Sequence, residues 1–196
     1  MTRHRERRLE RVLAPASEPV SLAEAKLYLR VTDNSEDALI FDLIVTARMA
    51  AEQFLQRSLI EQRWLVAYDD CARAELCLPM GPVQGIVSVK IYDRDTLLST
   101  LPVESYYLNA ARNKLVFASA VFGSAVGVGQ RVEVIYTTGY GDASAVPKPI
   151  KAGMLSHVAN LFDSRGEIWS AAGRIESAML PQQVMQLYGP YREMRL

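Results

Sequence analysis

Residues 131–162 read RVEVIYTTGYGDASAVPKPIKAGMLSHVANLF and contain both kinds of secondary structure that we expect in this chain. Val132, Val134 and Tyr136 occupy every second position, which is the period of a half-buried strand. A glycine-containing turn and two prolines then introduce a helix with one apolar face. The side chains of that face are Ile150, Met154, Leu155, Val158, Leu161 and Phe162. A strand followed by such a helix predicts a mixed fold.

The middle of the chain extends the strand period toward the N-terminus. Val87, Val89 and Ile91 again occupy every second position, and turn-forming groups such as Asp93-Arg94-Asp95 separate the segments with this pattern. Further strands are expected at 63–69, 74–78, 105–109 and 113–118. The middle of the chain is therefore predicted to be an antiparallel sheet.

Two helices are expected before the sheet. Ser21 and Glu24 have the spacing of a capping box, which opens a helix that runs to about Arg30. A second, longer helix follows, and its apolar residues recur at spacings of three and four. They are Ile40, Ile44, Ala47, Ala51 and Phe54. We therefore predict an α+β fold in which two N-terminal helices and a late helix pack on the antiparallel sheet.

Both ends of the chain are expected to be extended arms. Residues 1–20 are predicted to form a flexible basic arm and linker, because arginines gather there and Pro15 and Pro19 bar a continuous helix. Residues 21–166 form the expected core domain, and residues 167–196 a C-terminal arm with a short helix at 182–188. Apolar residues in such a short arm are buried either on another chain or on their own domain. The sequence leaves both alternatives open.

The charge balance gives no support to a globally basic, nucleic-acid-binding protein. Lys and Arg together number 22, as do Asp and Glu, so the formal net charge is zero. No apolar run approaches the ~18 residues of a membrane span, and the basic start lacks the apolar segment of a secretory signal. We expect a soluble protein made in the cytoplasm, with no membrane partner.

Catalytic and metal-binding groups are scarce in the sequence. The two histidines, His4 and His157, are too few for a His-based metal site or a catalytic triad. His157 adjoins an apolar residue of the late helix and is expected to be an ordinary, hydrogen-bonded helix residue. Cys71 and Cys77 have no second cysteine pair near them, which favours free thiols. The sequence therefore predicts no enzyme activity, no metal and no cofactor.

Other polar motifs have structural explanations. Asp69-Asp70 and Asp93-Arg94-Asp95 fall where strands should turn, and Asp is favoured there because its side chain bonds to the backbone. Gly123, Gly127 and Gly129 lack the spacing and the following Lys-Ser/Thr of a phosphate-binding loop. They indicate a glycine-rich loop.

The N-terminal arginines support a second possible function. They are Arg3, Arg5, Arg7, Arg8 and Arg11. Such a cluster could contact nucleic-acid phosphates. Glu6 and Glu10 lie at helical spacing from these arginines, however, which also suits a solvated helix. A DNA-binding accessory protein is therefore kept as the alternative function.

Several short strings occur in an order that resembles a known family. They begin with Ser21-Leu22-Ala23-Glu24-Ala25-Lys26 and Leu29-Arg30, continue through Leu78-Pro79, Pro82-Val83, Val87-Ser88-Val89-Lys90, Tyr92-Asp93 and Tyr106, and close with Val132, Val134, Tyr136, Gly139-Tyr140-Gly141, Val146-Pro147 and Ile150-Lys151. From Ser21 to Tyr191 their order and spacing resemble the small head-tail connector (adaptor) proteins of long-tailed bacteriophages and gene transfer agents. Relatives commonly have a glycine turn where this chain has Arg94-Asp95, so a longer or differently shaped hairpin is expected there.

The resemblance implies a structural protein of the head-tail junction of a virion or virus-like particle. Proteins of this family form a ring of about twelve copies on the portal protein, in line with the closed symmetry of most oligomers. The ring extends the DNA channel and provides a platform for the next stopper or tail protein. DNA is then expected to pass through the lumen without specific binding. On this view, the alternative is a DNA-binding accessory protein of particle assembly.

The resemblance also implies a role for the C-terminal segment, because in similar proteins this segment reaches into the portal. The portal-docking residues implied for this chain are Val184, Met185, Leu187, Tyr188, Tyr191 and Arg192. Aromatic and Met side chains are common contact residues in interfaces.

Overall fold

The computed structural model describes residues 7–69, 74–118, 130–164 and 180–193, and these divide into two compact units. The strand unit comprises residues 1–16 and 61–139, and the helical unit comprises residues 17–60 and 140–196. The chain thus enters the strand unit first, crosses to the helical unit, returns, and ends in the helical unit. Each unit has its own cluster of buried apolar side chains.

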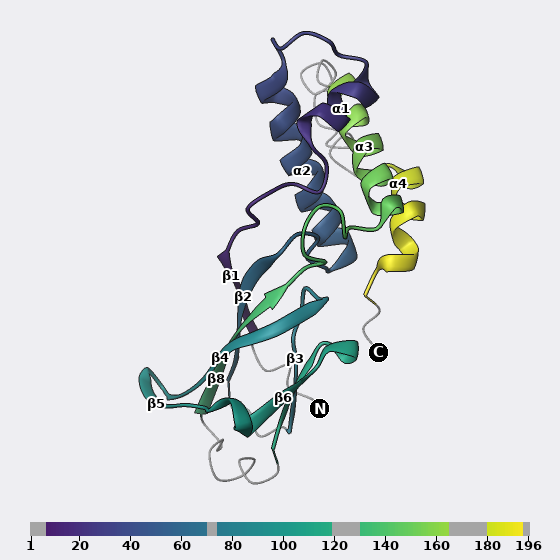
Figure 1. Cartoon of the computed structure of the whole chain (residues 1–196). Helices are drawn as coiled ribbons and strands as arrows, with labels where there is room; N and C mark the ends of the chain where they lie inside the picture. Colours follow the sequence, from purple (N-terminus) through teal and green to yellow (C-terminus); the bar gives the residue numbers. More distant parts are fainter. Residues whose placement is uncertain (1–6, 70–73, 119–129, 165–179, 194–196) are drawn as a thin grey trace, which may run out of the picture. The chain divides into compact units, whose positions relative to one another are not determined.

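The strand unit contains two antiparallel sheets (Figure 1). The five-stranded sheet has the order β1 (Arg7–Leu13), β2 (Gln62–Asp69), β8 (Gln130–Thr138), β4 (Val83–Asp93) and β5 (Thr96–Thr100). The three-stranded sheet has the order β3 (Glu75–Cys77), β7 (Lys114–Phe117) and β6 (Tyr106–Asn109), and the short 3-10 helices η1 (Val103–Ser105) and η2 (Ala110–Arg112) flank β6.

The alternation seen in the sequence sets the core of the strand unit. Val132, Val134 and Tyr136 of β8 are fully buried, because every second side chain of a strand lies on the same face. In the register of the sheet, Val134 lies between Val66 of β2 and Val89 of β4, which are also fully buried. Strand β8 is therefore the central strand of this core.

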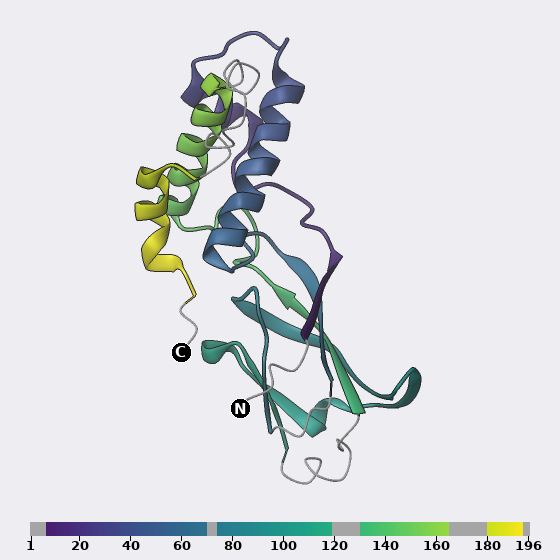
Figure 2. The same cartoon turned by 180° about the vertical axis from the view of Figure 1, so that it is seen from behind.

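The helical unit contains α1 (Leu22–Leu29), α2 (Asp37–Leu55), α3 (Lys148–Asp163), α4 (Gln182–Tyr188) and the 3-10 turn η4 (Gly189–Tyr191). The predicted capping box opens α1: the Ser21 backbone N–H donates to Glu24 Oε2 at 2.7 Å, and the Glu24 N–H donates to Ser21 Oγ at 3.2 Å. Figures 1 and 2 show α2 and α3 side by side, with α4 along α3.

The core of the helical unit is formed by the apolar faces of its own helices. Most of the predicted stripe of α2 is buried, and it meets the α3 stripe and one face of α4. Phe54 of α2 and Leu155 and Phe162 of α3 are only partly buried. The fully buried members are Ile40, Ile44, Ala47, Ala51, Ile150, Met154, Val158, Val184 and Tyr188. Val184 and Tyr188 belong to the C-terminal segment. From the sequence, this segment could dock either on another chain or on its own domain.

The α+β class and the antiparallel strands are confirmed, with two differences in detail. The buried side chains form one cluster within each unit. Residues Arg7–Leu13, expected in a flexible arm, form strand β1 paired with β2, so a solvated helix at these residues is wrong. The β4–β5 hairpin has a two-residue turn, Arg94-Asp95, with Arg94 in the left-handed conformation (φ 53°), which a glycine would adopt more easily.

Candidate functional site

Helix α4 is the predicted docking helix, and one of its faces is buried in the helical unit. The helix starts after Pro181 and is followed by Gly189. Val184 and Tyr188 lie four residues apart, on one side of the helix, and both are fully buried. The Tyr188 ring packs against Phe54 of α2, with 6.1 Å between ring centroids and a tilt of 47°. These two predicted docking residues therefore hold α4 on its own domain.

Other predicted docking residues remain accessible on the same segment. Met185 and Leu187 are 37% and 39% exposed. Tyr191 is partly buried against the helical core, and the exposed Arg192 places its guanidinium carbon 5.1 Å from the centre of the Phe54 ring, a cation–π contact. The structure thus gathers the six predicted residues into one segment but divides them between buried and accessible positions.

Gly153 of α3 makes room for Tyr188. A Cβ atom added to this glycine would lie 2.4 Å from Cε1 of the Tyr188 ring, well inside van der Waals contact. An isolated glycine inside a helical pattern can mark a place where another side chain packs closely on the helix. Gly153 could have been predicted from the sequence on this ground, but it is not among the residues predicted from the sequence.

Two buried polar groups lie in the same core. Neither ring nitrogen of His157 nor the hydroxyl of Tyr188 has a hydrogen-bond partner within the described part of the chain, so the expected hydrogen-bonded His157 is not observed. Burial lowers the pKa of His157, which favours the neutral imidazole, and burial raises the pKa of Tyr188.

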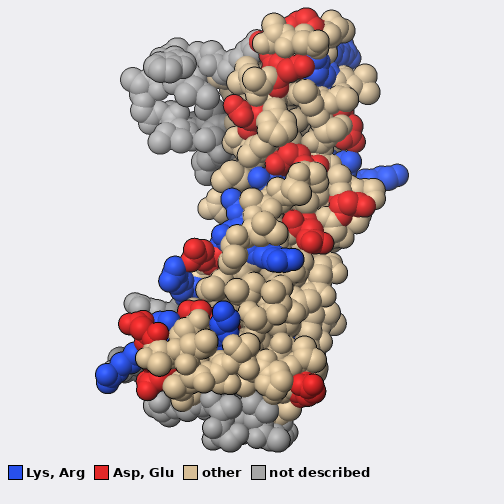
Figure 3. All heavy atoms as spheres, turned by 60° about the vertical axis from the view of Figure 1, so that its left-hand side comes forward, with Lys and Arg blue, Asp and Glu red and all other residues tan. Residues whose placement is uncertain are grey.

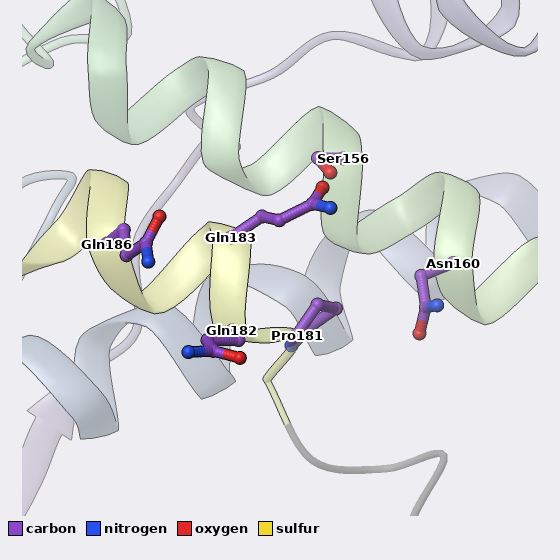
Figure 4. Close-up of a pocket in the computed structure, with 6 residues that line it drawn as sticks. All are labelled: Ser156, Asn160, Pro181, Gln182, Gln183 and Gln186. Atoms are coloured by element: carbon purple, nitrogen blue, oxygen red, sulfur yellow. The ribbon is translucent and has the colours of Figure 1, made fainter.

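An open groove of about 420 Å³ lies between α3 and α4 (Figure 4). Its lining consists of Ser156, Asn160, Pro181, Gln182, Gln183 and Gln186. In Figure 4 the Gln183 side chain points toward Ser156, across the start of the groove. These amides and this hydroxyl can form hydrogen bonds, but the lining as described contains no carboxylate, imidazole or amine for acid–base chemistry.

Metal-binding candidates are equally few. In residues 7–69, 74–118, 130–164 and 180–193, no group of three or more His, Cys, Asp or Glu side chains could hold a metal ion. Cys77 is a free, exposed thiol, whereas His4, Cys71 and the glycines of 123–129 lie outside the described residues. None of the helices that the structure describes is long and apolar enough to cross a bilayer.

Arg8 and Arg11, the N-terminal arginines whose side chains the structure describes, do not share one face. Arg3 and Arg5 lie outside the described residues, and Arg7, Arg8 and Arg11 belong to β1. Because successive residues of a strand point to opposite sides, Arg8 and Arg11 lie on different faces. Arg8 also pairs with Glu10 at 2.5 Å, with both side chains exposed. This arrangement does not favour the DNA-binding alternative.

Comparison with known proteins adds a family match in one part of the chain and a shared fold in almost all of it. Residues 19–93 match the family model described as phage gp6-like head-tail connector protein. This range contains α1, α2 and the first strands after them. No curated protein matches the chain.

Solved structures of gene transfer agent (GTA) particles contain similar chains. A chain from the neck of an empty GTA particle, computed with C6 symmetry, is 23% identical and has a TM-score of 0.74, with 96% of this chain and 97% of that chain covered. A chain from the neck of a native GTA particle, computed with C12 symmetry, is 22% identical with a TM-score of 0.75 and the same coverage. A chain of the native GTA virion is likewise 22% identical, with a TM-score of 0.75 and 96% of both chains covered. Residues 19–93 therefore resemble a head-tail connector family, and almost the whole chain shares the fold of chains from GTA particles.

Proposed function

We propose that this chain is a structural connector subunit at the head-tail junction of a phage or GTA-type particle. Two findings together support the proposal. Residues 19–93 match a head-tail connector family, and 96% of the chain shares the fold of GTA neck chains. The described residues also lack a constellation of catalytic groups, which agrees with a structural role.

We further propose that copies of the chain form a ring on the portal protein. The C12 symmetry of one matched neck supports a ring of about twelve copies, since a closed ring uses one repeated contact between unlike surfaces. Such a ring extends the DNA channel and offers a platform to the next stopper or tail protein. DNA passes through it without specific binding.

The function predicts a visible defect in particles. A producer strain that lacks this gene is expected to make heads without tails, because the platform for the tail is missing. Complementation with the natural sequence is expected to restore tailed particles, as seen by negative-stain microscopy. Normally tailed particles from the deletion strain would contradict the connector function.

We assign portal docking to the C-terminal segment, with Met185 and Leu187 as its accessible apolar contacts. Tyr191 and Arg192 follow them in the chain, while Val184 and Tyr188 hold α4 on the helical unit. Met185 and Leu187 are two residues apart and lie on the two flanks of the buried side of α4. A minority of interface residues, clustered near the centre of the contact, each cost more than about 1 kcal/mol of binding when they are removed. The segment can therefore contact the portal without leaving its own core.

The double substitution Met185→Glu/Leu187→Glu is expected to weaken binding to purified portal protein at least tenfold, since about 1.4 kcal/mol corresponds to a factor of ten. The matched control is Gln182→Glu/Gln186→Glu, which adds the same two carboxylates to exposed polar positions of the same helix. Biolayer interferometry measures both affinities. Equal affinity of the two double variants would remove portal docking from Met185 and Leu187 and leave the connector function standing.

A further inference from the structure

Helix α2 has a second apolar face on its solvent side. Phe41, Val45 and Met49 follow one another at intervals of four residues, with Ala38 three residues before them, so they form one stripe along the helix. Phe41 and Met49 are 49% and 51% exposed, and Val45 is partly exposed. We call these four residues the α2 outer stripe.

The outer stripe is distinct from the face that holds α2 in its own core. The inner face is the fully buried stripe that begins with Ile40 and Ile44. A helix with apolar residues on two faces is typically covered on both, because a surface helix otherwise shows a polar outer face. Figure 3 turns the α2 side of the molecule toward the viewer, and there charged groups are scattered over uncharged surface rather than gathered into one face.

A second exposed apolar group lies at the end of α1. Leu27 is 82% exposed and Tyr28 51%, and the exposed Arg30 caps the helix two residues later. On the described part of the helical unit, the exposed large apolar side chains lie at the α1 end, on α2 and on α4. Those of α2 are Phe41 and Met49 of the outer stripe and Leu39, which is 38% exposed and lies off the stripe. The unit therefore presents two unlike apolar surfaces besides α4.

We infer that the α2 outer stripe packs against the α1 end (Leu27, Tyr28 and Arg30) of the next copy of this chain in the ring. The inference rests on the proposed function, because a ring requires one contact between two different surfaces of neighbouring copies. The charges beside the two surfaces are complementary: the exposed Asp42 borders the stripe, and Arg30 belongs to the α1 end. Opposite charges at the rim of an apolar contact fix its orientation.

The contact can be tested in assembled particles by photo-crosslinking. Position 41 is replaced by p-benzoylphenylalanine, which keeps an aromatic side chain, in a deletion strain complemented with this variant. Irradiation is expected to give a product of twice the 21.8 kDa chain mass, with the cross-link mapped by mass spectrometry to residues 27–30. The same photoreactive residue at the exposed Thr46, which lies off the stripe on α2, is expected to give at least tenfold less of this product.

A second pair of variants tests the contact by assembly. Phe41→Glu/Met49→Glu is expected to leave the isolated chain folded, as seen by circular dichroism, but to reduce its copies per particle at least tenfold. Thr46→Glu/Gln53→Glu adds the same charges to exposed polar positions of α2 and is expected to assemble normally.

Three outcomes distinguish the inference from the function on which it rests. A cross-link from position 41 to a different protein overturns the inference, and so does the absence of any cross-link when the chain is present in the particle. In both cases tailless heads in the deletion strain would still support the connector function. Tailed particles without the chain would overturn both.

Discussion

Replacing Arg48 by methionine is expected to lower the free energy of unfolding of the helical unit by about 3–5 kcal/mol. The Arg48 side chain is only 5% exposed. Its Nε atom lies 2.7 Å from Oε2 of Glu18, and a terminal guanidinium nitrogen lies 2.9 Å from Oε2 of Glu52, which is also buried. Methionine is similar in length but carries no charge, so it would leave both carboxylates without their cation.

The cost is large because Glu52 is tied into the fold on its other side. Its Oε1 atom accepts a hydrogen bond from the Leu59 backbone N–H at 2.9 Å. The network thus connects three segments: Glu18 lies before α1, Arg48 and Glu52 belong to α2, and Leu59 follows α2 in the chain. A buried carboxylate that loses its cation must stay desolvated or draw water into the core, and either choice destabilises the folded state.

Urea denaturation followed by the helical circular dichroism signal measures this effect. Lys151→Met is the matched control, because it removes the cation of the Lys151–Glu24 pair at 3.1 Å in the same unit, where Glu24 is 47% exposed. Exposed pairs contribute at most about 1 kcal/mol. If Arg48→Met proved no more destabilising than Lys151→Met, the buried network would not be what holds these three segments together.

The parts of the fold that depend on local pattern could be predicted from the sequence. The capping box of Ser21 and Glu24 and the inner stripe of α2 use residues three or four positions apart, which interact within one helix. Strand β8 is central and its alternating side chains are buried, so its period of two is clear in the sequence. These features depend on neighbours along the chain.

Edge strands were missed for a physical reason. All five residues of β5, Thr96–Thr100, are exposed, so no burial imposes an apolar alternation on them. Strand β1 lies at the other edge of the sheet and carries charges on both faces. Because edge strands bury little, their sequences look like those of loops or arms.

The candidate site depended on contacts between residues far apart in the chain. The sequence indicated a short amphipathic helix at 182–188, and α4 has these bounds. Which of its faces is buried depends on Gly153 in α3 and Phe54 in α2, and no local pattern contains that information. The likeness to connector proteins, in turn, came from the order of several weak strings and not from any one of them.

Replacing Tyr188 by alanine is expected to lower the free energy of unfolding of the helical unit by about 3–5 kcal/mol, the range for removing a large aromatic side chain from a core. The ring is fully buried between α3 and Phe54 of α2. Tyr188→Phe is the matched control, since it removes only a buried hydroxyl that has no partner among the described residues. This control is expected to change stability by less than about 1 kcal/mol.

Gly153→Ala shows whether the loss at Tyr188 arises from its packing on α3. Alanine is more favourable than glycine inside a helix by about 1 kcal/mol, but its Cβ would lie 2.4 Å from the Tyr188 ring, and overpacking of this kind costs about 1–3 kcal/mol. The substitution should therefore destabilise the natural chain and stabilise the Tyr188→Ala chain. Urea denaturation of the natural chain, the two single variants and the double variant measures both changes. A stabilising effect of Gly153→Ala in both backgrounds would mean that α4 does not rest on α3 in solution. The C-terminal segment would then be free to reach the portal with Val184 and Tyr188 as anchors, as the resemblance alone implies.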